Sequence, residues 1–332
     1  MLKMINDKPL VSIITPCYNG EAFVHRYFEG ILSQTYPNIE VIFINDGSTD
    51  RTEEIALDYG EKLRGKGIDF TYVFQDNAGQ SVAVNKGLKL FKGEYLIWPD
   101  SDDWMDSEHI EKEVEFLEQN PDKAIVLCKV AYVNENGNIL SYKERKNKDK
   151  GNIFEDLINI NDIYFAAGAY MVRTKEFLQT NPDRSIYESR GGQNWQLLLP
   201  ICYKYECGFI DKKMYNIYIR SNSHSREKTD YKRAIERRER LEDVLLNTLD
   251  RIDMPESQKK EYKDHIRLIY LEKKFYVTAL YRNKKQMKTY YCILLENGAA
   301  TKKIRQRYII GRSLILSLCF RAYIRFRNLF RS

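Results

Sequence analysis

Short apolar runs alternate with amphipathic segments along the N-terminal third of the chain. Four runs rich in β-branched and aromatic residues have the length of strands: residues 10–15, 39–44, 70–74 and 95–98. Apolar residues at three- and four-residue spacings predict helices between them, over residues 20–35, 50–64 and 79–91. This alternation predicts an α/β fold with a mainly parallel sheet and helices on both faces.

A polar motif follows each of these four predicted strands. In chain order the motifs read TPCYNG, NDGSTD, QDNAGQS and PDSDDW. Parallel strands place their carboxyl ends at one edge of a sheet, and ligands of such sheets bind beyond that edge. The sequence therefore predicts one ligand site formed by the four loops.

The pattern changes after the fourth motif. It predicts helices over residues 107–120 and 192–205, and strands over 124–134, 163–173 and 207–219. The Lys- and Asn-rich stretch 134–152 is predicted to be a solvated surface loop rather than an anion-binding patch. Residues 228–298 are charged, helical in pattern and poor in Pro and Gly. We expect three parts: a domain over 1–225, a helical appendage over 226–300 and a basic segment over 301–332.

Composition narrows the class of protein and its compartment. With 43% hydrophobic and 30% charged residues, the chain has the balance of a soluble globular protein. Its six cysteines include no CxxC pair, which favours reduced thiols and a cytoplasmic location. The N-terminus lacks the features of a signal peptide, and no uncharged apolar run reaches the roughly 18 residues of a membrane span.

The basic excess of the chain lies in its C-terminal segment. Nine of the 53 basic residues and none of the 47 acidic ones follow residue 300, so residues 1–300 carry a net charge of −3. On a helical wheel, residues 309–330 separate an apolar face from one with Arg321, Arg325 and Arg327. Such a helix suits an anionic membrane surface. The alternative is packing against the protein's own helices or a homo-oligomer partner; nucleic acid is not expected, because the rest of the chain is acidic.

The motif chemistry suggests a nucleotide and a metal ion. Asp46 at the second strand end suits a hydrogen bond from a base or ribose, and Gly79 and Ser81 open a helix whose N-terminus suits a diphosphate. Asp100 and Asp102 would crowd beside that anion. A divalent Mg²⁺ or Mn²⁺ between the carboxylates and the phosphates resolves the repulsion.

Four stretches carry a resemblance to a known family: VSIITPCYN, EVIFINDGSTD, NAGQSVAVNKGL and GEYLIWPDSDDW. In this order and spacing they resemble family 2 glycosyltransferases with the Rossmann-like GT-A fold, including bacterial enzymes that build capsular, exopolysaccharide or lipopolysaccharide chains. The resemblance is strong over residues 10–120 and weaker to about 225. It implies a metal-dependent, inverting transfer of a sugar from a nucleotide donor, most often UDP-linked, to an acceptor hydroxyl of a glycan or lipid-linked molecule.

The resemblance also assigns roles residue by residue. Asp46 matches the uracil-binding acid, Asp100 the acid facing ribose or sugar, and Asp102 the metal ligand of the Asp-x-Asp motif, a catalytic residue through the metal that it holds. The segment YIRSNSHSRE resembles the one that closes over bound donor, with His224 as a second metal ligand or, alternatively, a surface histidine. The donor-binding residues it implies are Pro16, Tyr18, Asn19, Asp46, Asn77, Gly79, Ser81, Asp100, Ser101 and Arg220.

Two departures from the family pattern bear on activity. Val84 occupies a position where relatives often carry Arg, and Lys86 is one candidate replacement. The usual Glu-Asp pair is replaced by Gln193-Asn194, whose amides cannot accept a proton at neutral pH. These two residues and Trp195 are expected on the acceptor side.

The missing acid leaves two hypotheses for function. Glu188 is the nearest upstream carboxylate and is either the catalytic base or a surface acid. In the first hypothesis the chain is an active transferase. In the second it is a catalytically silent nucleotide-binding or scaffold subunit of a polysaccharide-synthesis complex. A nicotinamide enzyme is disfavoured, because no G-x-G-x-x-G motif accompanies the strands.

Overall fold

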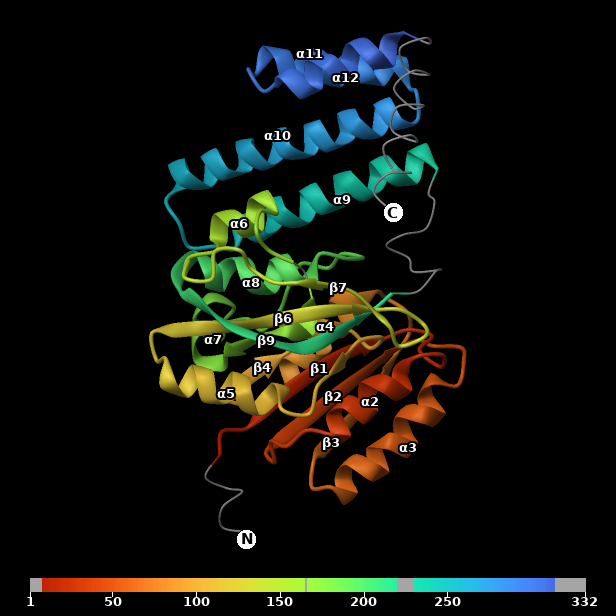
Figure 1. Cartoon of the computed structure of the whole chain (residues 1–332), viewed down its shortest axis with the longest axis vertical. Coiled ribbons are helices and arrows are strands. Elements are labelled where there is room, and N and C mark those ends of the chain that lie inside the picture. Colours follow the sequence, from red (N-terminus) through yellow and green to blue (C-terminus); the bar gives the residue numbers. More distant parts are fainter. Residues whose placement is uncertain (1–7, 165, 220–229, 314–332) are drawn as a thin grey trace. The chain divides into compact units, whose positions relative to one another are not determined.

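The computed structural model of the chain describes residues 8–164, 166–219 and 230–313 (Figure 1). The chain divides into two compact units, Met1–Arg226 with Asn247–Asp253 and Glu227–Leu246 with Met254–Ser332. The first unit contains the sheet and all four polar motifs.

The first unit is built on a nine-stranded sheet of order β3-β2-β1-β4-β8-β6-β9-β5, with β7 paired to β6. Strands β1, β2, β3 and β4 pair in parallel, which confirms the alternation predicted from the sequence. Beyond β4 the sheet is mixed, because β8 runs antiparallel to both β4 and β6. The strands are β1 (Val11–Cys17), β2 (Ile39–Asp46), β3 (Asp69–Gln75), β4 (Tyr95–Ile97), β5 (Trp104–Met105), β6 (Lys123–Val133), β7 (Ile139–Lys143), β8 (Tyr170–Arg173) and β9 (Glu206–Tyr218).

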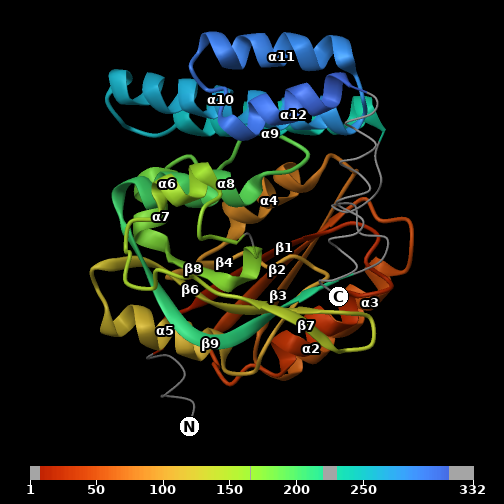
Figure 2. The ribbon, with the colours of Figure 1, turned by 45° about the horizontal axis from the view of Figure 1, so that its top comes forward.

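Helices cover both faces of this sheet (Figure 2). Phe43 of β2 packs on Phe28 of α2 with ring centroids 5.2 Å apart. The next residue, Ile44, points to the opposite face, where a Cβ added to Gly87 of α4 would lie 3.1 Å from it. The helices of this unit are α2 (Val24–Leu32), α3 (Thr52–Gly65), α4 (Gln80–Leu90), α5 (His109–Gln119), α6 (Phe154–Asn159), α7 (Thr174–Thr180) and α8 (Gln193–Lys204), with a 3₁₀ turn at Ala167–Ala169.

The predicted surface loop at 134–152 is wrong in two respects. Its first part forms a hairpin of β6 with β7, closed by a turn in which Asn134 Oδ1 accepts hydrogen bonds from two backbone amides and Gly137 has φ +78°. Arg145, expected in solvent, is 1% exposed and lies 3.5 Å from Asp156. A buried cation requires such a partner, so this part of the basic run belongs to the core.

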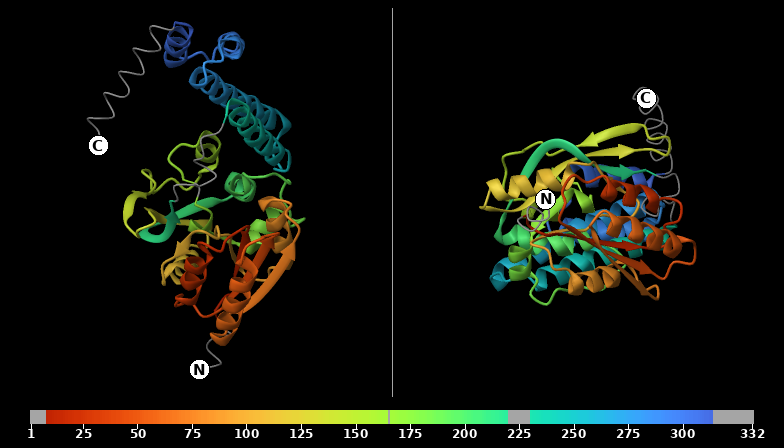
Figure 3. Two further views of the ribbon diagram at one scale, coloured as in Figure 1. Left: turned by 90° about the vertical axis from the view of Figure 1, so that its right-hand side faces the viewer. Right: turned by 90° about the horizontal axis from the view of Figure 1, so that it is seen from below.

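The second unit consists of four helices, which confirms the predicted helical appendage over the described residues. Within it, α9 and α10 lie side by side (Figure 3), joined by an ion pair of 2.7 Å between Glu242 and Lys274. A small apolar core that includes Phe275, Leu294 and Ile304 joins α10, α11 and α12. The helices are α9 (Tyr231–Asp250), α10 (Glu256–Leu280), α11 (Lys284–Glu296) and α12 (Lys302–Arg312).

The basic C-terminal segment lies only partly within the described residues. Helix α12 ends at Arg312, and Ser313 has extended backbone angles, so a single helix does not run unbroken through the segment. The amphipathic face predicted for residues 314–330 lies outside the described residues, and its membrane association stays a prediction. Among the residues that the structure describes, every helix is too short or too polar to cross a bilayer.

Candidate functional site

The loops after β1, β2, β3 and β4 meet at one edge of the sheet. The parallel register pairs Cys17 at the end of β1 with Asn45, and Asn45 in turn with Phe74 near the end of β3. The structure thereby brings together the four motifs that the sequence places far apart.

The first two loops are bound to each other by hydrogen bonds. Asn19, with φ +49°, accepts from the Thr49 amide through Oδ1 at 2.9 Å and donates its own amide to Ser48 Oγ at 2.9 Å. Pro16 lies within β1, opposite Ile44. Tyr18 is 48% exposed, so its ring is available to a ligand.

Asp46 holds the third loop in place. Its Oδ1 accepts hydrogen bonds from Gln75 Nε2 at 2.6 Å and the Ala78 amide at 2.9 Å, and Oδ2 accepts from the Gly79 amide at 3.0 Å. Asn77 Nδ2 adds a bond to the Asp46 carbonyl. With 4% of its surface exposed, Asp46 acts on the loop backbone, and its expected contact with uracil stays a prediction.

Helix α4 begins directly after this loop. Gly79 precedes it with φ +97°, a conformation that favours glycine, and the first-turn amides of the helix are suited to an anion. Ser81, expected to contact the donor, is fully buried, and its hydroxyl donates to the Ser189 carbonyl at 2.6 Å. Ser81 therefore positions the 189 segment beside α4.

The fourth loop, or acid loop, carries three carboxyl groups, those of Asp100, Asp102 and Asp103. Gln80 Nε2 at the start of α4 donates to Asp100 Oδ1 at 3.0 Å, and Asp103 accepts from the Tyr218 amide at 2.9 Å. Burial and the neighbouring Asp102 charge raise the pKa of Asp100 to about 7. Burial, with Asp102 and Asp100 beside it, raises the pKa of Asp103 well above its ordinary value. Ser101 is buried between these acids.

The carboxylate oxygens of this loop fit a hard divalent cation. Asp100 and half-buried Asp102 offer oxygen ligands only, which Mg²⁺ and Mn²⁺ prefer. Burial and the neighbouring Asp102 charge both oppose ionisation of Asp100 and so raise its pKa. A metal ion bound by Asp100 and Asp102 would favour the ionised carboxylates.

The residues expected on the acceptor side are largely buried. Asn194 Oδ1 accepts a hydrogen bond from Trp98 Nε1 at 2.9 Å, so it is tied to the strand that precedes the acid loop. Trp195 Nε1 donates to the Leu157 carbonyl at 3.0 Å, and only 8% of Trp195 is exposed. Gln193, the first residue of α8, is equally buried. Glu188, in contrast, is exposed.

Arg190 is a site residue that the sequence reasoning missed. A Cβ added to Gly79 would lie 3.4 Å from Arg190 Cγ, so this exposed arginine lies at the start of α4. Val84 is 1% exposed, so it does not face a ligand there. The signal was the position of Arg190 directly before two glycines and α8, but only the fold places it beside the third loop. Arg220 and His224 lie outside the described residues.

Residues 12–180 match the sequence model of Glycosyl transferase family 2. Among curated proteins, an uncharacterized glycosyltransferase of Rickettsia typhi is 37% identical over 153 residues, covering 45% of this chain and 46% of the relative. The uncharacterized glycosyltransferase EpsJ of Bacillus subtilis is 40% identical over 112 residues, covering 34% of this chain and 31% of the relative. The matched part thus spans less than half of each of these relatives.

Two solved structures have the same fold. The first is TarS 1-349 of S. aureus in complex with UDP-GlcNAc, with a TM-score of 0.60, 17% identity and coverage of 91% of this chain and 90% of that chain. The second is the mannosyltransferase PcManGT of Pyrobaculum calidifontis in complex with GDP-Man and Mn²⁺, with a TM-score of 0.55, 17% identity and coverage of 95% and 87%. These likenesses confirm the GT-A-like α/β fold.

The Asp46 contacts generate a first prediction. In Asp46→Asn, an amide NH₂ replaces one acceptor that faces backbone N–H donors, so we expect a loss of about 1–3 kcal/mol of stability. Backbone amides of Ala78 and Gly79 should exchange faster with deuterium, as measured by mass spectrometry. Asp58→Asn, which alters an exposed acid of α3, is the matched control and should change neither quantity. Unchanged exchange at Ala78 and Gly79 in Asp46→Asn would contradict the assigned role.

Proposed function

The chain belongs to Glycosyl transferase family 2, and we propose that it transfers a sugar, with inversion, from a UDP-sugar to a hydroxyl of a glycan or lipid-linked acceptor in bacterial surface polysaccharide synthesis. One observation carries this proposal: the acid loop, whose charged residues are all acidic, lies against the N-terminus of α4, where Gln80 donates a hydrogen bond to Asp100. This geometry suits a diphosphate and a cation together. The ligands named for the two solved structures, UDP-GlcNAc and GDP-Man with Mn²⁺, support the donor class.

The donor would extend across the four loops. The exposed Tyr18 ring offers a stacking surface for the base, and the amides at the start of α4 face the diphosphate. Asp46 keeps the Ala78–Gly79 turn in the conformation that presents those amides. Asp100 and Asp102 would hold Mn²⁺ or Mg²⁺, which when bound stabilises the negative charge of the diphosphate leaving group.

Removal of the metal-binding charge tests this arrangement. Asp102→Asn keeps the side-chain volume but removes a carboxylate, so Mn²⁺-dependent UDP binding and sugar transfer should fall on the order of 100-fold or more. Calorimetry with UDP and Mn²⁺ and a panel of nucleotide sugars with purified protein measure both quantities. A variant with wild-type Mn²⁺ dependence and turnover would reject the metal role of Asp102.

Arg190 is proposed as the cation that faces the donor diphosphate. Its side chain lies against Gly79, and the Ser81 hydroxyl fixes the adjoining Ser189 carbonyl, so the backbone that carries Arg190 is anchored to α4. A guanidinium there would balance the negative charge of the diphosphate, which the acidic side chains of the acid loop cannot balance. It would take over the task that relatives give to an arginine at the Val84 position.

We expect Arg190→Ala to weaken UDP binding about tenfold, because one charge-assisted phosphate contact is lost. Binding of uridine, which carries no phosphate, should stay unchanged. Lys86→Ala tests the other candidate cation; because exposed Lys86 lies farther along α4, we expect this variant to keep wild-type UDP binding. Equal losses for UDP and uridine in Arg190→Ala would show that the residue supports the fold rather than the diphosphate.

Glu188 is the proposed general base. The acceptor oxygen would form the new bond to the anomeric carbon as the bond to the UDP oxygen breaks, and its proton would pass to a carboxylate. Asn194 cannot take that proton, and its oxygen already accepts the Trp98 indole N–H. Glu188 is exposed, and it lies on the segment that Ser81 and Asn85 bind to α4.

Glu188→Gln should lower the turnover number by about 100-fold or more while leaving UDP affinity unchanged, because the amide cannot accept a proton. Initial rates at saturating donor, together with UDP calorimetry, separate the two effects. If Glu188→Gln keeps wild-type turnover, the base lies elsewhere. If the wild-type protein binds UDP but neither transfers nor hydrolyses any sugar in the panel, the alternative of a silent nucleotide-binding subunit replaces the proposal.

A further inference from the structure

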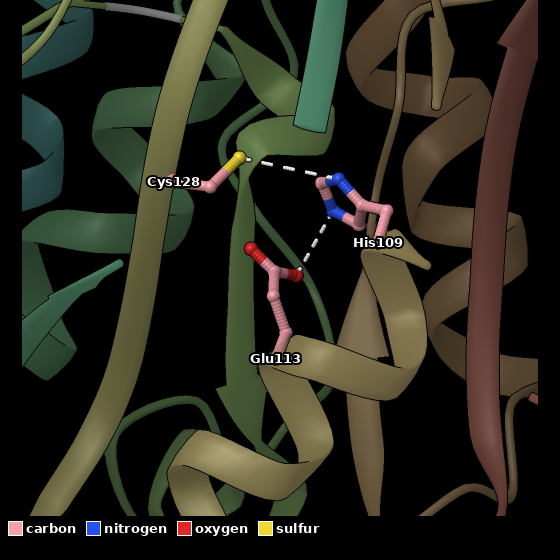
Figure 4. A group of neighbouring side chains, drawn as sticks. All are labelled: His109, Glu113 and Cys128. Atoms are coloured by element: carbon pink, nitrogen blue, oxygen red, sulfur yellow. Dashed lines mark hydrogen bonds and ion pairs between the residues drawn. The ribbon is translucent and has the colours of Figure 1, made fainter. Parts of the chain in front are cut away.

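A buried cluster of three metal-ligating side chains lies away from the donor loops. His109 and Glu113 are one turn apart on α5, and Cys128 lies on β6 (Figure 4). All three residues have no exposed surface. Their ligand atoms lie within 4.8 Å of one another, and the three side chains point toward a common centre.

The hydrogen bonding of His109 determines which nitrogen faces this centre. Nδ1 lies 3.0 Å from the Met214 carbonyl oxygen, which can only accept, so Nδ1 carries the proton. Nε2 then offers a lone pair, yet it lies 3.0 Å from Oε2 of the Glu113 carboxylate, which also offers lone pairs. Two acceptors facing each other in a dry interior require a proton or a metal ion between them.

The group between them is therefore either a proton, held by His109 or by Glu113, or a metal ion. A proton on Nε2 would give a His109–Glu113 ion pair; although burial opposes it, the Glu113 charge raises the pKa of His109 well above its ordinary value. A proton on Nε2 would contact one carboxylate oxygen, whereas Glu113 Oε1 is buried and lacks a hydrogen-bond partner. Cys128 Sγ, 3.9 Å from Nδ1, would be left as an ordinary thiol.

We propose that His109, Glu113 and Cys128 form a second metal site that binds zinc. With a dication, one thiolate, one carboxylate and one neutral imidazole sum to zero charge, as a fully buried site requires. A thiolate and an imidazole select zinc over Mg²⁺ or Mn²⁺, unlike the oxygen-only acid loop. The bond from Nδ1 to the Met214 carbonyl is the kind of support that orients a ligating histidine.

The position of the cluster indicates a structural role. The Met214 carbonyl also accepts the Asp106 amide at 2.8 Å, which ties β9 to the chain just after the acid loop. Four residues farther along β9, the Tyr218 amide donates to Asp103. Zinc bound to His109 would therefore restrain β9, the strand whose Tyr218 amide binds Asp103 of the acid loop.

Metal analysis of the full-length protein tests the site without reference to activity. After expression with added zinc and dialysis against EDTA, we expect the protein to retain stoichiometric zinc in elemental mass spectrometry. Protein refolded with Co²⁺ should show a thiolate-to-cobalt charge-transfer band in the near ultraviolet. Cys128→Ser should remove the band, because it replaces the thiolate with a hydroxyl.

Two control variants localise the signal. Cys292→Ser, at a half-buried cysteine of α11, should keep both the zinc and the band. Asp102→Asn should keep them as well, which separates this site from the donor-site metal. Folded wild-type protein that holds neither zinc nor cobalt would overturn the proposal and assign a proton to the cluster. A band that persists in Cys128→Ser would overturn it equally.

Discussion

The hydrogen bonds of the Asp46 carboxylate are the interaction on which the proposed donor site depends. This carboxylate lies at the end of β2. It accepts hydrogen bonds from Gln75, the last residue of β3, and from the Ala78 and Gly79 amides in the loop that follows β3. Charge-assisted bonds of this kind are short and strong where water is excluded. They fix the turn from which α4 starts, and the orientation of α4 determines where its N-terminal amides point.

Crowded, buried carboxyl groups lie at the same edge. The acid loop lies against the start of α4 with three carboxyl groups, and burial raises the pKa of Asp100 and Asp103. The fold admits two kinds of compensation there. A divalent cation can bind to the acids, and Arg190, on the segment between α7 and α8, lies against Gly79. Both would act on a diphosphate, which explains why acids and an anion site can share one edge.

Beta strand β9 links this edge to the rest of the first unit. It binds Asp103 through the Tyr218 amide, and through the Met214 carbonyl it binds both Asp106 and His109. The cluster of His109, Glu113 and Cys128 can therefore restrain the acid loop through β9, whether a proton or a metal ion occupies the cluster.

The sequence by itself determined the strand and helix alternation, because burial patterns of period two and near 3.6 are local. It also identified the four loops, since parallel strands must end at one edge, and the family. Only the tertiary structure decided what each polar group does there. The side chains of Ser81 and Asn194 form hydrogen bonds with segments about a hundred residues away, and Arg145 is buried beside Asp156, its ion-pair partner. Arg190 reaches the donor loop for the same reason: such contacts depend on how strands pair across the sheet, which local patterns do not encode.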